Sequence, residues 1–173
     1  MIKIVALLLS MSFLAACRAE NATDDEVTKA HDMFAKQKTE NYVIFSPLQG
    51  VLMEGGEPLP NVKIIRRLKW NGNEEGLVEE FTTDDRGRFS LPLHEEPLAL
   101  GVLSQFVASV DLELKTERGC DYLWTSSKFF PEIYTETDGK VEGLICDVNS
   151  EEIAVPMGAT SILTKCRWKN MPE

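Results

Sequence analysis

The sequence contains few of the residues that build catalytic and metal sites. It has two histidines, His31 and His94, and no Cys-x-x-Cys or Gly-x-Ser-x-Gly motif. Zinc sites and redox pairs need closely spaced cysteines or histidines, and α/β-hydrolases need the strained serine turn. Neither histidine has a partner at metal-ligand spacing, so we expect solvated rather than catalytic histidines. No calcium-loop pattern occurs. The sequence therefore predicts no catalytic residue, no metal and no cofactor.

Positive charge is also scarce. The chain carries 18 Lys and Arg against 28 Asp and Glu, a formal net charge of −10. The phosphates of nucleic acid repel such a surface, so nucleic acid is excluded as a partner. Hydrophobic residues nevertheless make up 43% of the chain. That share predicts a globular protein, and the length of 173 residues suits one domain with a single core.

Long apolar runs are missing except near the start, where one extends from Ile4 to Leu14 after Lys3. It is too short to cross a bilayer, which takes about 20 apolar residues. A cationic start, a short apolar segment and small residues describe a secretory signal. An ordinary cleaved signal or a buried helix is the alternative interpretation. The run ends in Leu14-Ala15-Ala16-Cys17, which resembles the lipobox of bacterial lipoproteins.

In that family the cysteine sulfur receives a diacylglyceryl group, the leader is cut before the cysteine, and the new amine is acylated. The resemblance therefore implies a signal peptide over 1–16 and lipid attachment at Cys17. Two or more acyl chains give stable anchoring, so the membrane is an expected partner. Arg18 stands where the family's inner-membrane retention signal has Asp. The resemblance thus implies an outer-membrane anchor that faces the periplasm.

Residues 17–41 are expected to form the lipid anchor and a polar tether, followed by a β domain over 42–170. A short helix over 24–37 is predicted because apolar residues recur at helical spacing after a capping box. The residues concerned are Val27, Ala30, Met33 and Phe34, with Thr23 and Glu26 in the capping box. The helix either docks on the domain or belongs to a flexible leash.

From residue 42 onward, short apolar runs alternate with turn residues, as in β-strands joined by tight turns. We expect nine strands and no further helix, over 42–45, 48–53, 61–70, 77–83, 88–91, 106–114, 120–130, 141–148 and 161–168. The strands over 77–83 and 88–91 are predicted to pair as a hairpin around Asp84-Asp85-Arg86-Gly87. The predicted fold class is all-β, a two-sheet antiparallel β-sandwich.

A pattern of glycines and apolar residues occupies the first half of this domain, at Gly50, Val51, Gly56, Pro58, Leu59, Val62, Ile64, Thr83, Asp84, Gly87, Phe89 and Leu91. It is similar to the pattern G-x-V … G-x-P-L-x-x-V-x-I … T-D-x-x-G-x-F-x-L of the carboxypeptidase-regulatory-like, or transthyretin-like, domain. The resemblance implies a transthyretin-like sandwich. Residues 45–168 also resemble an uncharacterised family of small bacterial proteins, which implies no activity.

Three cysteines follow the lipobox, in what would be an oxidising compartment. Cys146 and Cys166 each lie on the apolar face of a predicted strand, and the two strands are consecutive. Such cysteines can meet if the strands are neighbours, so we expect a Cys146–Cys166 disulfide with Cys120 unpaired. The bond would stabilise the fold by roughly 3 kcal/mol. The alternative is three buried thiols, because Cys often serves as a small core residue.

Cations concentrate on a single predicted strand, at Lys63, Arg66, Arg67 and Lys69. They are a candidate partner-binding stripe for an acidic protein. The interpretation we favour is cross-strand pairing with Glu79 and Glu80 just beyond the following loop. Aromatic residues offer a similar choice. By alternation, Tyr122 and Trp124 are predicted to share a face of their strand. With Trp70 and Trp168 they either line a sugar-binding face or, as we favour, pack in the core or at its rim.

The function we expect is non-enzymatic: a lipid-anchored periplasmic β-sandwich that binds another macromolecule, in the first place a protein, or supports the envelope. A sharper alternative is an immunity protein that neutralises a toxin delivered into the periplasm, because acidity steers binding toward basic clefts. The alternative from a different class is an envelope-polymer hydrolase. The sequence offers it no recognisable nucleophile, metal set or cofactor loop.

Overall fold

The computed structural model describes residues 38–116, 119–158 and 160–172. The signal predicted over 1–16, Cys17 and the helix predicted over 24–37 lie outside these residues. The described part of the chain is built from strands and contains no helix. Accordingly, none of its segments is a helix long and apolar enough to cross a membrane.

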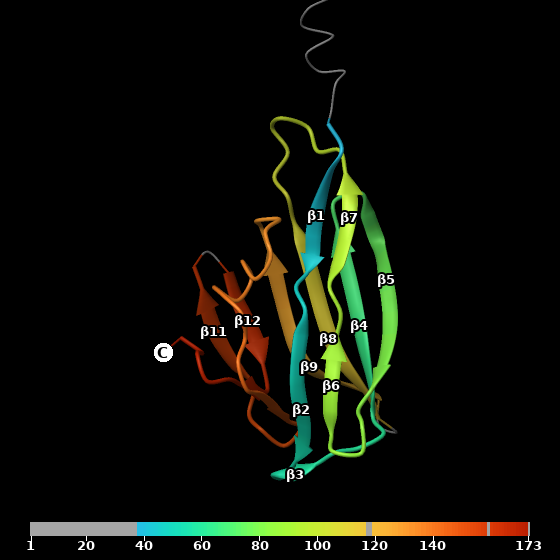
Figure 1. Ribbon diagram of the computed structural model, residues 1–173, viewed down its shortest axis with the longest axis vertical. Helices are drawn as coiled ribbons and strands as arrows, with labels where there is room; N and C mark the ends of the chain where they lie inside the picture. The colour runs from blue at the N-terminus through green and yellow to red at the C-terminus, as the bar shows by residue number, and fades with distance from the viewer. Residues whose placement is uncertain (1–37, 117–118, 159, 173) are drawn as a thin grey trace, which may run out of the picture. The chain divides into compact units, whose positions relative to one another are not determined.

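Thirteen strands form the described part of the domain, where nine were expected (Figure 1). They are β1 Glu40–Phe45, β2 Leu48–Glu54, β3 Glu57–Pro58, β4 Lys63–Trp70, β5 Asn73–Thr82, β6 Arg88–Leu91, β7 His94–Leu98, β8 Ala108–Thr116, β9 Gly119–Lys128, β10 Leu144–Asp147, β11 Ile153–Met157, β12 Thr160–Thr164 and β13 Cys166–Arg167. The additional strands are β3, β7, β11 and β13. Each is five residues or shorter, so apolar alternation hardly marks it in the sequence.

One sheet contains six strands in the order β11-β12-β9-β8-β4-β5, and every neighbouring pair in it is antiparallel. Its centre is the long register of β4 between β5 and β8, in which Arg66 stands opposite Glu79 on one side and Leu112 on the other. Alternate residues of β4 point into the molecule, because successive side chains of a strand face opposite sides.

The second large sheet has the order β13-β10-β2-β3, with β6 also paired to β2. In it β10 runs parallel to β2, which departs from the expected antiparallel arrangement. A hairpin forces its strands to be antiparallel, but these two strands are far apart in the chain and no such turn joins them. A two-stranded ribbon of β1 and β7 completes the fold.

Apolar side chains of the two large sheets form one core between them. In Figure 1, β2 and β6 lie in front of β4, β8 and β9. Fully buried members come from both layers: Leu52, Leu91 and Leu144 from one sheet, and Ile64, Leu68, Leu112, Trp124 and Ile162 from the other. The prediction of an all-β sandwich is confirmed.

The predicted hairpin of residues 77–83 with 88–91 is wrong. Strand β5 pairs with β4 and strand β6 pairs with β2, so the chain crosses from one sheet to the other between them. The turn itself is as expected, because Asp84 accepts hydrogen bonds from the backbone N–H groups of Arg86 and Arg88, both at 2.8 Å. Turn residues dictate a reversal, but not which strand the chain pairs with afterwards.

The last predicted strand, 161–168, is broken at Lys165. Strand β12 belongs to the six-stranded sheet and β13 to the other, so the chain changes layer at this residue. The Lys165 backbone donates to the carbonyl of Leu123, and its ammonium reaches Asp121 at 2.8 Å and the carbonyl of Val148 at 3.1 Å. Apolar alternation continues through the break, which explains why the sequence gives no sign of it.

Two glycines of the motif allow close packing of the crossing segments. A Cβ on Gly50 would lie 2.8 Å from the Phe89 ring, and one on Gly87 would lie 2.6 Å from the carbonyl oxygen of Leu52. Gly87 also has a φ of 69°, which other residues adopt only with strain. Beside it, the buried Thr83 hydroxyl donates to the carbonyl of Leu59 at 2.9 Å. The motif therefore builds the connection between the two sheets.

Candidate functional site

The predicted disulfide is confirmed. Cys146 of β10 and Cys166 of β13 stand directly opposite each other in an antiparallel pair and are bonded. Among the cysteines of the described residues, Cys120 alone is unpaired, and it is exposed. The bond ties the final strand to the sheet that contains β2.

The four cations of the candidate stripe do not share one surface. Lys63, Arg67 and Lys69 face outward, but Arg66 occupies an inward position of β4 and is 0% exposed. Adjacent residues of a strand point to opposite faces, so a run that contains both Arg66 and Arg67 must split. A docking role for the three exposed cations stays a prediction.

Cross-strand pairing, the alternative we favoured, is confirmed for two of these cations. Lys63 bonds Glu80 at 2.8 Å, and Arg66 bonds Glu79 at 2.6 Å. The Lys63 ammonium holds the pKa of Glu80 below its usual range, chiefly through this hydrogen bond. Arg67 pairs instead with Glu113 of β8, at 3.0 Å. Most of the positive charge on β4 is thus matched by neighbouring carboxylates.

Arg66 is enclosed on every side. Its guanidinium lies 4.7 Å from the centroid of the Phe45 ring and 5.0 Å from that of Phe81. It also donates to the carbonyl of Pro92 at 2.6 Å, in addition to its bonds with Glu79. Burial lowers the pKa of Arg66, while Glu79 opposes that shift. These contacts occupy the guanidinium within the fold, so Arg66 has a structural role.

The tryptophans are core residues. Trp70, Trp124 and Trp168 are all buried, and the last two pack ring against ring with centroids 5.4 Å apart. Tyr122 is exposed, because a bulge between Tyr122 and Trp124 puts these residues on opposite faces of β9. The prediction that they share a face is wrong, and the four residues form no common sugar-binding surface.

His94 is also more enclosed than the sequence suggested. We expected a solvated histidine, but its ring is largely buried, packs beside Trp70 and lies 2.9 Å from a carboxylate oxygen of Glu96. Residues two apart on a strand share a face, which explains why His94 meets Glu96. Within the described part of the chain, no three His, Cys, Asp or Glu residues are grouped to hold a metal ion.

A cleft of about 400 Å³ opens near the edge of the six-stranded sheet that β11 forms. One wall is the end of β9 with the segment that follows it, and the other is the turn between β11 and β12. Its lining combines apolar side chains with hydroxyls and carboxylates: Phe129, Phe130, Pro156, Met157 and Pro172, then Ser127, Thr135, Glu136, Asp138 and Thr160. The volume is within the range of ligand and side-chain pockets.

A buried ion pair forms part of the cleft wall. Lys128, the last residue of β9, bonds Glu136 at 2.8 Å, and both side chains are more than nine-tenths buried. Glu136 also accepts the backbone N–H of Ser46, and the Ser46 hydroxyl accepts the backbone N–H of Tyr134 at 2.7 Å. The network therefore fixes the segment after β9 against the β1–β2 connection.

This network has a structural role and not a catalytic one. Lys128 lies 3.3 Å from the Ser46 hydroxyl, which invites comparison with a serine nucleophile and its lysine base. However, Ser46 is buried and does not line the cleft, and Glu136 compensates the ammonium. Burial lowers the pKa of Lys128, and Glu136 opposes the shift. The hydroxyl oxygen is engaged by Tyr134 and has no open approach for a substrate.

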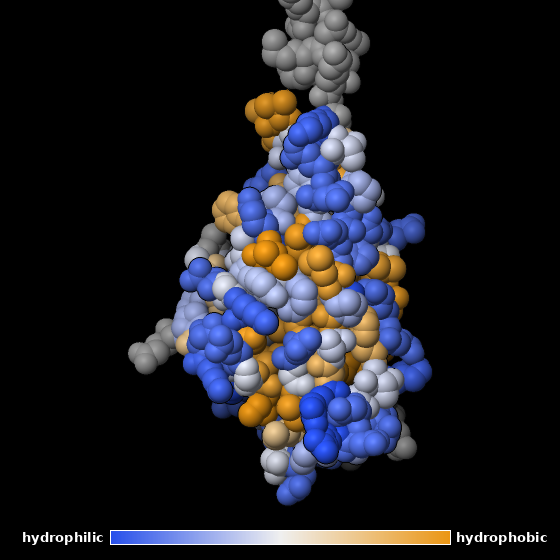
Figure 2. All heavy atoms as spheres, in the orientation of Figure 1, coloured by the Kyte–Doolittle hydropathy of each residue, from blue (hydrophilic) through white to orange (hydrophobic). Residues whose placement is uncertain are grey.

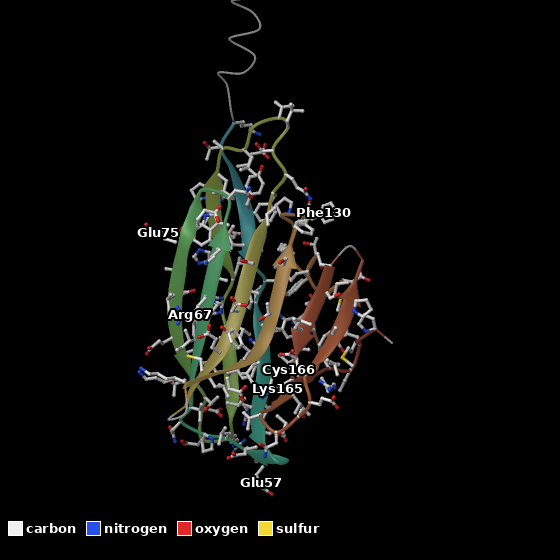
Figure 3. All side chains as sticks on the ribbon, turned by 180° about the vertical axis from the view of Figure 1, so that it is seen from behind. Glu57, Arg67, Glu75, Phe130, Lys165 and Cys166 are labelled. Atoms are coloured by element: carbon white, nitrogen blue, oxygen red, sulfur yellow. A yellow bond between two sulfur atoms is a disulfide. The ribbon has the colours of Figure 1, made fainter. Side chains whose placement is uncertain are left out.

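At the mouth of the cleft, Phe130 is 63% exposed. Figure 3 shows it projecting past the end of β9, away from the body of the sandwich. An exposed aromatic ring beside a concave surface is a frequent anchor of protein contacts. Nearby Ile133 is also exposed. The cleft thus pairs a rigid polar wall with an apolar rim.

Sequence reasoning did not find this site. Lys128 follows the buried Trp124 and Ser126 at alternate positions of β9. This alternation is the one signal in the sequence that the Lys128 side chain points inward. Its partner Glu136 lies outside the strands, where the sequence pattern makes no prediction of contacts. Only the folded chain brings Ser46 beside both of them.

The fold and the site together define an all-β sandwich with a preformed cleft at one edge. The chain matches the family described as Domain of unknown function (DUF6795) over residues 48–151 and belongs to that family. The match contains the Lys128–Glu136 wall of the cleft and ends before β11 begins. A search of curated proteins found no match, and a search of solved structures found none either.

Proposed function

We propose that the protein is a lipid-anchored binding module of the bacterial periplasm, and that the cleft receives a side chain or loop of a protein partner. The observation that carries the binding role is the cleft itself, with its exposed Phe130 and its ion-paired wall. The anchor is supported by Leu14-Ala15-Ala16-Cys17, which resembles a lipobox. An outer-membrane location follows the same resemblance, through Arg18.

A binding role suits a wall that is already fixed. Because Lys128, Glu136 and Ser46 hold the segment after β9 in place, little conformational entropy remains to be lost when a partner docks. Apolar residues at the rim supply burial, and the hydroxyls of Ser127 and Thr135 supply hydrogen bonds. The partner we expect presents an apolar anchor with basic flanks, because the protein is acidic and Asp138 lies in the cleft.

We also propose that the sandwich belongs to the transthyretin-like group. Its support is the part that the motif plays in the fold: Gly50 and Gly87 allow close packing, and Thr83 with Asp84 builds the crossing between the sheets. An experimental structure superimposed on members of that group tests the proposal. A different order of the strands β2, β6, β4 and β5 would overturn it.

The binding role is tested by placing a photoreactive benzoylphenylalanine at position 130 in living cells. We expect one protein to be crosslinked there and to be identified by mass. The matched control is the same probe at Tyr122, which is also exposed but lies near the start of β9, whereas Phe130 follows its end. The variant Phe130→Asp should abolish co-purification of that protein without changing the melting temperature. Equal crosslinking at both positions, or none at 130, would overturn the binding role.

The anchor is tested separately by the mass of the N-terminal peptide. A diacylglyceryl-modified, acylated Cys17 at the new N-terminus is the expected result, with the protein in the outer-membrane fraction. The variant Cys17→Ser should stay unlipidated and leave that fraction. An intact Met1 on a protein found in the cytosol would contradict the anchor while leaving the crosslinking result to stand alone.

A further inference from the structure

An apolar turn projects from the loop between β7 and β8. The backbone N–H of Ser104 bonds the carbonyl of Gly101 at 2.8 Å and closes the turn. The two central residues, Val102 and Leu103, are 86% and 96% exposed. Among the exposed large apolar side chains of the described residues, these two are the most open to solvent. Single exposed apolar residues need no explanation, but two adjacent ones at the tip of a turn do.

The turn stands on a fixed base. Asn71, in the β4–β5 turn, donates its side-chain amide to the carbonyl of Gln105 at 3.1 Å and accepts the backbone N–H of Val107 at 2.6 Å. On either side of the tip, Leu100 and Phe106 turn inward and pack on the core. The loop therefore packs Leu100 and Phe106 on the core, while Val102 and Leu103 project from its tip.

The tip lies at the end of the domain where the chain enters it. Glu40, the first residue of β1, pairs with Leu98, the last residue of β7, immediately before the loop. Figure 1 shows the start of β1 and the β7–β8 loop at the same end, and Figure 2 shows an apolar projection there above a mostly hydrophilic surface. The residues that precede Lys38 lead back to Cys17, so this is the end of the domain that the tether of an anchored chain joins.

We propose that Val102 and Leu103 insert into the lipid surface to which the chain is anchored. The inference rests on the lipid anchor of the proposed function. Two apolar side chains on a narrow turn suit shallow insertion among lipid headgroups, where interfacial segments bury apolar residues. A convex tip of two residues is small for a stable protein contact, which takes about 800 Å² on each side. The insertion orients the domain, so the tether is not its sole attachment.

The contact is apolar rather than electrostatic. The chain carries a net charge of −10, and anionic lipids repel it. The ammonium of Lys38, at the same end, is paired with Glu40 at 3.0 Å. Attraction to the bilayer must therefore come from the buried area of Val102 and Leu103. Raising the ionic strength should not weaken the contact, since salt screens the charge repulsion and leaves apolar burial intact.

The test uses the full chain, purified from membranes and reconstituted into vesicles of phosphatidylethanolamine and phosphatidylglycerol with a brominated phosphatidylcholine. In the variant Leu103→Trp we expect the added fluorescence to be quenched by the brominated lipid, at low and at high salt. Trp70, Trp124 and Trp168 are buried and provide a constant background. The matched control is Ile145→Trp, a half-exposed apolar position in β10, which should not be quenched.

Adding Val102→Asp to Leu103→Trp should abolish the quenching, because a charge at the tip opposes insertion. A lipidated Leu103→Trp chain whose added fluorescence is not quenched would overturn the tip and leave the anchor standing. If the chain purified from membranes carries no lipid at Cys17 and its added fluorescence is still quenched, the anchor is overturned and the insertion of the tip is supported. A tip shielded from aqueous acrylamide without quenching by lipid would assign it to a contact between copies of the chain and overturn the proposal.

Discussion

Two ion pairs, each with a buried cation, hold this domain together in different ways. Arg66–Glu79 lies within the six-stranded sheet, where two phenylalanine rings and a backbone carbonyl close around the guanidinium. Lys128–Glu136 joins the end of a strand to a connecting segment, and both of its members line the cleft. Burial lowers the pKa of each cation, and its carboxylate opposes the shift in both cases. The electrostatics are similar, but the surroundings differ.

The difference separates stability from function. Arg66 connects neighbouring strands that are already paired along their length, so its loss should weaken the whole sandwich. Lys128 fixes a segment that no strand pairing holds, so its loss should loosen that segment first. Proteins often place binding surfaces on connecting segments that a rigid scaffold holds. The cleft follows this rule, because it lies beside the connecting segment that Lys128 fixes and not beside Arg66.

The largest effect on stability is expected at Arg66, whose guanidinium is enclosed within the six-stranded sheet. Arg66→Ala should lower the free energy of unfolding by about 3–5 kcal/mol, because it leaves Glu79 unpaired and opens a cavity between Phe45 and Phe81. Equilibrium urea denaturation measures the loss, with an unchanged slope. The control Arg66→Met keeps a long apolar stem between Phe45 and Phe81 and should lose clearly less. Equal losses for the two variants would show that the apolar stem contributes nothing and that the whole loss comes from the missing charge.

A second test removes the disulfide that secures the final strand. The double variant Cys146→Ala/Cys166→Ala should lower the free energy of unfolding by about 3 kcal/mol, since the bond closes a loop of 20 residues. Adding a reductant to the unchanged protein should have the same effect, and adding it to the double variant should have none. Cys120→Ala, at an exposed thiol, is the control and should alter stability by less than about 0.5 kcal/mol.

A third test asks whether the cleft pair acts locally. Lys128→Met leaves the buried Glu136 carboxylate without its cation but with the Ser46 backbone N–H as a donor, and we expect a loss of about 1–3 kcal/mol. Hydrogen exchange should accelerate most at the backbone amides of Ser46 and Tyr134, which the network holds. Amides of β8 should follow only the global change. If β8 accelerated as much as Tyr134, the contrast between the two pairs would fail.

The smallest effect is expected at a surface carboxylate that belongs to neither pair. Hydrogen bonds from the backbone N–H groups of Asn149, Gly55 and Gly56 hold the pKa of Asp147 below its ordinary value. A lowered pKa adds stability that is present above the unfolded value, about 3.9, and is lost as the pH falls through the folded value. Asp147→Asn should therefore flatten the acid limb of the stability curve below about pH 4. An unchanged limb would contradict the assignment.

Much of the fold could be predicted because strand patterns are local. Alternation along β4 and β8, the turn at Asp84 and the apolar faces that carry Cys146 and Cys166 all depend on residues close in the chain. The partners of each strand depend instead on distant segments. That is why the hairpin of β5 with β6 was wrong, and why the parallel pairing of β10 with β2 was not foreseen.

The candidate site was beyond the sequence for the same reason. Ser46, Lys128 and Glu136 are separated by as many as 90 residues and share no motif, so nothing local predicts their contact. Similarly, the cations of β4 look like one stripe in the sequence, and only the pleat of the strand sends Arg66 inward.

By itself, the sequence determined the all-β class, most of the strands, the turn chemistry and the disulfide. Each of these follows from the period of a strand or from the conformations that Gly, Asp and Pro allow. Only the tertiary structure decided which strands are neighbours, where the chain changes sheets at Lys165, and which polar side chains are enclosed. Those outcomes depend on burial in a shared core, and burial is a property of residues that meet only when the chain has folded.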